Sequence, residues 1–149
     1  MTSILEDRFA GPGSPKNMEL GYLFLRIFLG MNLFNHGLMR FLTGITAWEQ
    51  PLAETFVNTY LPMPMVHFAL YLIPFVELII GTFLLLGLLT QRALLGSLLL
   101  FTVLMYGHTV RQSWEGAHLM MHYGVYCWIL LAFRRYNWLA LDKRKTKAT

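Results

Sequence analysis

The histidines are the residues of this chain whose chemistry and spacing most suggest a site. All five stand at corresponding ends of its apolar stretches: His36, His67, His108, His118 and His122. Because consecutive helices in a bundle alternate in direction, we expect these ends to meet on one side. With a rise of about 1.5 Å per residue, His36, His108 and His122 come within about one helical turn of each other in depth. Imidazole can bind metal ions, haem iron or a quinone carbonyl, so we predict that these three residues bind a cofactor.

Other interpretations of the histidines stay open. The deeper three can be packing residues with satisfied hydrogen bonds, and His67 and His118 can lie at the membrane interface. Two of the deeper three can also ligate a b-type haem axially. Met63 and Met65 before His67 would suit copper, although methionine is also a common filler of apolar helices.

Two charged residues fall inside apolar stretches, and they are candidates for catalytic roles. Arg26 lies about two turns into the first stretch, and Glu77 lies near the middle of the second. Their depths differ by roughly 7 Å at the helical rise, which an extended arginine nearly spans. A charge near the bilayer centre is costly unless it is paired, so we expect the two to pair directly or through water. The pair can be a structural salt bridge or a proton-handling site, because burial raises the pKa of a carboxyl group.

The composition predicts an integral membrane protein. The chain is 56% hydrophobic and only 13% charged, with a mean hydropathy of +0.48. Hydropathy predicts four spanning helices, at about 19–40, 65–89, 92–110 and 117–133. We therefore predict an all-α fold, a four-helix transmembrane bundle over residues 19–135. A leader (1–18) would precede it, and a basic tail (136–149) would follow.

The connector between the first two spans carries its own pattern. Trp48, Leu52, Phe56 and Tyr60 are spaced four residues apart, which predicts an amphipathic helix lying in the interface. The lone cysteine, Cys127, cannot form an internal disulfide, and we expect it to be a buried packing residue. Gly81 and Gly87, with Gly96 and Ser97 across the following turn, should allow close helix contact.

The charges predict the orientation of the chain. Most lysines and arginines fall on one side, so both termini should be cytoplasmic. The opposite side holds Arg40 and Arg111 together with three glutamates. Beside a spanning helix, the basic tail should contact anionic lipid, and we expect no nucleic-acid partner. The first residues lack the basic start and apolar centre of a cleaved signal peptide.

Three segments carry a family resemblance. The sequences RIFLGMNLFNHGLMRFLTG (26–44), PFVELIIGTFLLLGLLTQRALLGSLLL (74–100) and YNWLALD (136–142) resemble the DoxX family. The resemblance implies a four-helix protein of the bacterial inner membrane, related to membrane subunits associated with thiosulfate:quinone oxidoreductase. Arg26, His36 and Glu77 match its anchors, whereas His108 and His122 rest on their depth alone.

The first functional hypothesis is a quinone-interacting membrane subunit of an oxidoreductase complex. Partner subunits would supply electrons, the three deeper histidines would hold the quinone head, and Glu77 with Arg26 would carry protons. One alternative is a non-catalytic accessory subunit that stabilises a larger membrane complex, because the sequence has no dinucleotide loop or cysteine cluster. Another is a b-type haem or copper protein. Whether the chain is itself an enzyme stays open.

Overall fold

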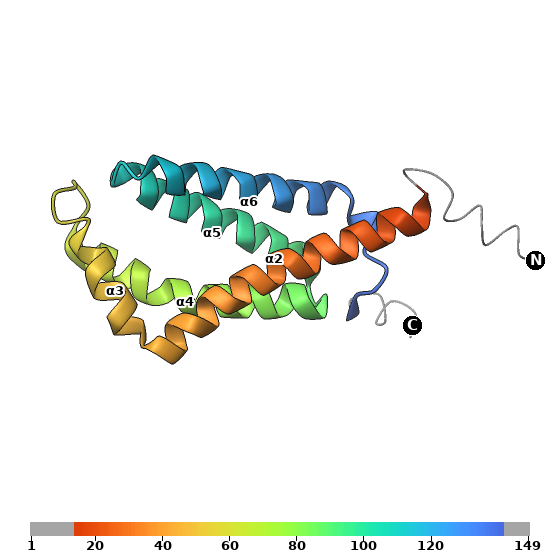
Figure 1. The fold of residues 1–149 in the computed structure, drawn as a ribbon, viewed down its shortest axis with the longest axis horizontal. Helices are drawn as coiled ribbons and strands as arrows, with labels where there is room; N and C mark the ends of the chain where they lie inside the picture. Colours follow the sequence, from red (N-terminus) through yellow and green to blue (C-terminus); the bar gives the residue numbers. More distant parts are fainter. Residues whose placement is uncertain (1–13, 142–149) are drawn as a thin grey trace, which may run out of the picture.

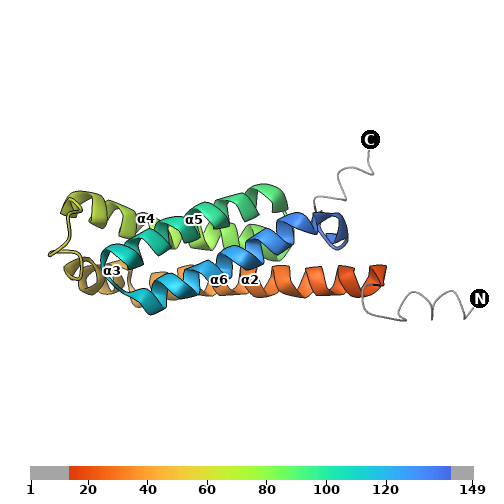
Figure 2. The same ribbon diagram turned by 90° about the horizontal axis from the view of Figure 1, so that it is seen from above.

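Residues 14–141 are described by the computed structural model, and they are helical throughout the core. Four long helices lie side by side and alternate in direction, while a shorter helix, α3, crosses one end (Figures 1 and 2). The elements are α2 (Pro15–Thr43), α3 (Ile45–Glu54), α4 (Met63–Leu86), α5 (Thr90–Val110), α6 (Trp114–Ala132) and the 3₁₀ turn η1 (Arg134–Tyr136). No strand occurs between residues 14 and 141, which confirms the all-α prediction.

The hydropathy of the helices agrees with a membrane protein. Within the described chain, α4 and α5 are long and apolar enough to cross a bilayer, with mean hydropathies of 2.2 and 1.7. That α2 and α6 cross it as well remains a prediction. The start of α2 and the η1 turn lie at one end of the bundle, which we call the terminal end, and α3 lies at the other, the α3 end (Figure 1). Most of the predicted leader and basic tail falls outside the described residues.

The helix boundaries follow local capping chemistry. Ser14 caps α2, with its hydroxyl oxygen accepting from the amide of Asn17 at 3.4 Å, and Pro15 occupies the first helical turn. The helix therefore begins four residues before the predicted span. α4 ends at Leu86 because the next residue, Gly87, adopts the left-handed conformation at φ 65°, so this helix is shorter than predicted at its C-terminal end.

α3 is also shorter than the predicted amphipathic helix. The helix ends at Glu54, and the residues that follow form turns. The hydroxyl group of Thr55 donates to the carbonyl oxygen of Leu52 at 2.6 Å, which competes with continued helical bonding. Phe56 lies in these turns and is buried against the bundle.

The closest helix contact joins α2 to α4 through glycines. A Cβ atom on Gly81 would lie 2.4 Å from the backbone nitrogen of Phe34, and one on Gly37 would lie 2.8 Å from that of Leu78. Such distances leave no room for a side chain, so the two backbones pack directly. The expectation that Gly81 allows close helix contact is confirmed, and the helix it contacts is α2. Cys127 is fully buried, as predicted.

Candidate ligand cavity

A cavity of about 450 Å³ lies at the α3 end of the bundle, and all five helices contribute to its wall. This volume is within the range of small-molecule sites, which is roughly 300–1,000 Å³. Most of the wall is apolar or aromatic, including Leu52, Phe56, Ile73, Phe101 and Leu104. The charged groups form two clusters, one around Glu77 and one around His108.

Glu77 forms an ion pair with Arg40 in the first cluster. Glu77 extends from α4 and is 3% exposed, whereas Arg40, near the end of α2, is 17% exposed. The guanidinium of Arg40 also lies over the ring of Trp48 from α3, at 4.0 Å from the ring centroid. These contacts link three helices around one buried carboxylate, which is the arrangement that a buried charge requires.

The predicted pairing of Glu77 with Arg26 was wrong. The glycine contacts set the register of the antiparallel helices: Gly37 lies beside Leu78, and Arg26 lies against Gly87. Glu77 precedes Gly87 by ten residues, or about 15 Å along the helix, which is twice the predicted depth difference. The estimate failed because it assumed that the two helix ends are level, whereas Arg26, eleven residues into α2, lies beside Gly87, the residue that follows α4.

Arg26 instead holds the terminal end of the bundle together. It is 2% exposed, and its guanidinium donates to Asn137 Oδ1 at 2.8 Å and to the carbonyl oxygen of Leu139 at 2.9 Å. The amide of Asn137 donates in turn to the hydroxyl of Thr90 at 3.1 Å. Arg26 therefore ties α2 to the segment after α6, away from the cavity.

His36 lines the cavity from α2, at the level of Glu77. Its side chain is exposed, and its ring nitrogens make no hydrogen bond to any residue from 14 to 141. One helical turn earlier, Asn32 also lines the cavity and donates to the hydroxyl of Tyr123 at 2.8 Å. The ring of Tyr123 stacks on Phe101, with centroids 5.1 Å apart. These contacts make an aromatic wall between α5 and α6.

The second polar cluster surrounds His108. Arg111 donates from Nη2 to His108 Nδ1 at 3.0 Å, and Ser113 Oγ lies 3.3 Å from the same nitrogen. The guanidinium of Arg111 also lies over the ring of Phe56, at 5.1 Å, and donates to the hydroxyl of Thr55 at 3.3 Å. Partial burial lowers the pKa of Arg111 from its ordinary value. Arg40 and Arg111, predicted only as charges of the outer side, thus both line the cavity.

His122 does not join His36 and His108. It is exposed on α6, and its Nδ1 atom donates to the carbonyl oxygen of His118 at 2.9 Å. The neighbouring residue Tyr123 lines the cavity instead. Depth alone suggested His122, but successive helical residues differ by about 100° in direction, and that rotation turns His122 away.

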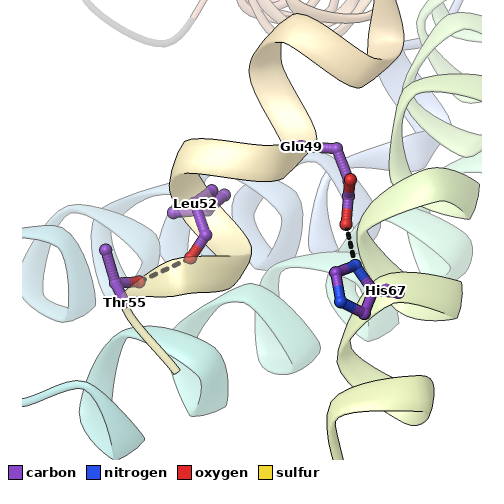
Figure 3. A network of polar contacts seen from close by, with 4 residues as sticks. All are labelled: Glu49, Leu52, Thr55 and His67. Atoms are coloured by element: carbon purple, nitrogen blue, oxygen red, sulfur yellow. Dashed lines mark hydrogen bonds and ion pairs between the residues drawn. The ribbon is translucent and has the colours of Figure 1, made fainter. Parts of the chain in front are cut away.

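His67 has a separate role at the α3 end. Its Nδ1 atom bonds the carboxylate of Glu49, which extends from α3 (Figure 3). His67 is 51% exposed and Glu49 is 7% exposed. Neither residue lines the cavity, but their contact fastens α3, whose Trp48 and Leu52 do line it.

One comparison with known proteins returns a match. The DoxX family model matches residues 21–110, which is more than half of the chain. The chain belongs to the DoxX family. The resemblance stated from the sequence is thereby confirmed. No curated protein and no solved structure matches the chain.

The DoxX match covers the cluster around Glu77 and reaches His108, whereas Arg111 and Ser113 lie just beyond it. It runs from α2 to the end of α5 and so includes His36, Arg40, Glu77 and His108. α6 lies beyond the matched residues, together with Tyr123 and His122. As a member of this membrane-protein family with two strongly apolar helices, the chain is a membrane protein.

Proposed function

We propose that this DoxX protein is a quinone-interacting subunit of a membrane oxidoreductase complex. The observation that supports it best is the cavity, in which an ion-paired carboxylate and a hydrogen-bonded histidine face an otherwise apolar space. A quinone head is a flat, largely apolar ring with two oxygen acceptors. Such a ring needs aromatic walls and a small number of donors, and the cavity supplies both.

The residues that line the cavity offer a quinone a hydrogen-bond donor, an aromatic wall and a carboxylate that can hold a proton. His108 is a donor for one oxygen, while Phe101 and Tyr123 offer a flat aromatic wall. A bound quinone supplies two-electron, two-proton redox chemistry. Glu77 would hold and release a proton at its carboxylate, and Arg40 would stabilise its charged form. Electrons would come from a partner protein.

The cavity also has a route to the surface. Met65, Val103 and Leu119 line it and are exposed on the outside of the bundle, so the wall has an edge that lipid would contact. A hydrophobic quinone dissolved in the bilayer would enter there. In this proposal all four long helices cross the bacterial inner membrane, with both termini in the cytoplasm.

A b-type haem fits the residues less well. Axial ligation needs a lone pair on a ring nitrogen. Nδ1 of His108 already accepts from Arg111, and His118 and His122 lie one turn apart on one helix, so they cannot approach a haem from opposite faces.

Binding of a short-chain ubiquinone to the full chain in lipid nanodiscs tests the proposal. Trp48 lines the cavity, so the quinone should quench tryptophan fluorescence, and Trp48→Phe should remove that part of the signal. His108→Ala and Glu77→Gln should each weaken binding, while His122→Ala, outside the cavity, should not. Equal binding by all of these variants would refute the quinone site.

Variants of the cavity histidines distinguish a quinone-interacting subunit from a non-catalytic accessory subunit. In the native complex, His36→Ala and His108→Ala should lower quinone reduction without loss of assembly. A complex that keeps its activity after removal of this chain would support the non-catalytic alternative.

A further inference from the structure

The strongest unexplained feature is the set of contacts around one edge of the His108 ring. Arg111, Ser113 and Gly116 all meet the Nδ1 edge, while Nε2 has no hydrogen-bond partner among residues 14–141. We call these three residues the histidine seat. They come from the turn between α5 and α6 and from the first turn of α6.

The seat arises from the way α5 ends. The amide of Ser113 donates to the carbonyl oxygen of His108 at 2.9 Å, and that of Gln112 donates to Thr109 at 3.0 Å. Gln112 is left-handed, with φ 58°. This is the Schellman pattern of helix termination, and it folds the chain back so that Ser113 lies beside the histidine.

Gly116 lies directly against the His108 ring. A Cβ atom at this position would lie 2.1 Å from Nδ1 and 2.3 Å from Cε1 of His108. The imidazole therefore rests directly on the backbone of α6, and any larger residue would push it away.

The chemistry of the seat fixes the state of the ring. A guanidinium has only donors, so Nδ1 of His108 must accept from Arg111 through its lone pair. The proton of the neutral imidazole is then on Nε2, the nitrogen left without a partner. A proton on Nδ1 would instead face an N–H of Arg111 at 3.0 Å.

We propose that Arg111, Ser113 and Gly116 are positioning residues that hold His108 as an Nε2–H donor toward the cavity. The cavity ligand must then present an oxygen acceptor at this end, such as a carbonyl or a carboxylate. This state disfavours a metal ion at Nε2, because the ring proton occupies the lone pair that a metal would need. The acceptor requirement rests on the proposed function, but the state of the ring does not.

The first test measures the ring in the absence of ligand. NMR of the full chain with isotope-labelled histidine, in lipid nanodiscs, distinguishes protonated from unprotonated ring nitrogens, and His108→Gln assigns the signals. We expect His108 to show a protonated Nε2 and an unprotonated Nδ1. Arg111→Met should give a mixture of tautomers, and Arg111→Lys, which keeps a donor, should restore part of the bias. A protonated Nδ1 in the unmodified chain would overturn the proposal.

The second test uses a pair of matched glycine variants. Gly116→Ala should displace the His108 ring, whereas Gly124→Ala, on the same helix with nothing within 4 Å of the new Cβ, should not. Both changes raise helix propensity by a similar amount, so a difference between the two variants reports the contact with His108. We expect Gly116→Ala to shift the His108 signals and to weaken binding of short-chain ubiquinone by about fivefold, which is the effect of one lost hydrogen bond.

The outcomes separate the seat from the quinone site. Unchanged His108 signals in Gly116→Ala would refute the claim that Gly116 positions the ring. The unmodified chain could show the expected protonated Nε2 and yet fail to bind ubiquinone. That result would support the positioning of His108 and refute quinone as the ligand. In that case, binding of a small carboxylate such as benzoate would identify the alternative acceptor.

Discussion

The ion pair between Arg40 and Glu77 gives the sharpest prediction about stability. Arg40→Met should cost more than Glu77→Gln, because the two partners are not equally buried. Removal of the arginine leaves a carboxylate that is only 3% exposed, whereas removal of the carboxylate leaves a guanidinium that is 17% exposed and still stacked on Trp48.

The expected magnitudes follow from this asymmetry. Breaking a buried ion pair costs about 3–5 kcal/mol, and the partial exposure of Arg40 places Arg40→Met near 3 kcal/mol. Glu77→Gln keeps a hydrogen-bond acceptor for Arg40 and should cost about 1–2 kcal/mol. The double variant should cost less than the sum of the two, by about 1–2 kcal/mol, because the residues contact each other.

Equilibrium unfolding in mixed detergent micelles would measure these values. The control is a second cycle with Arg26→Met and Glu77→Gln, two residues about 15 Å apart by helical rise, which should be additive within about 0.5 kcal/mol. Coupling of Glu77 to Arg26 but not to Arg40 would refute the helix register described above.

Three further predictions concern the packing and the turns. Gly81→Ala should destabilise the protein by about 1–3 kcal/mol, because the new Cβ would meet the backbone of α2 at 2.4 Å, while thermal unfolding of Gly124→Ala should match or exceed the unmodified chain. Gln112→Gly should raise the melting temperature, by relief of up to about 1 kcal/mol of left-handed strain; a lower value would refute the strain argument. Glu49→Gln should increase proteolysis or hydrogen exchange in α3, since its bond to His67 fastens that helix, and unchanged exchange would contradict this role.

The sequence predicted the helices well because hydropathy and length decide them. Four apolar stretches became four long helices, and the histidines fell on the α3 end because helices joined by short turns must alternate in direction. The spacing of Trp48, Leu52, Phe56 and Tyr60, an apolar stripe, likewise predicted a helix across that end. Its length was overestimated, since the stripe continues into turns that still bury Phe56.

Helix rotation and register could not be predicted in the same way. Uniformly apolar helices have weak periodicity, so nothing in the sequence showed that Tyr123, and not His122, faces the cavity. The assumption that neighbouring helices end at the same level was enough to assign Glu77 to Arg26, although the start of α2 extends beyond the end of α4. The glycines of α2 carried the missing signal, because a close backbone contact fixes the register, but their partners are visible only in three dimensions.

The place of Arg111 at the cavity was not predicted either. At the level of sequence it was a charge at a helix end, where a cation normally faces solvent or headgroups. Arg111 follows His108 by three residues at the end of α5, which puts its guanidinium beside the imidazole, and the turns after α3 place Phe56 against it, so its charge acts on the cavity. A cation held there sets the donor state of an imidazole without binding a ligand itself. The chemistry of this site therefore depends on a turn as much as on the membrane helices that enclose it.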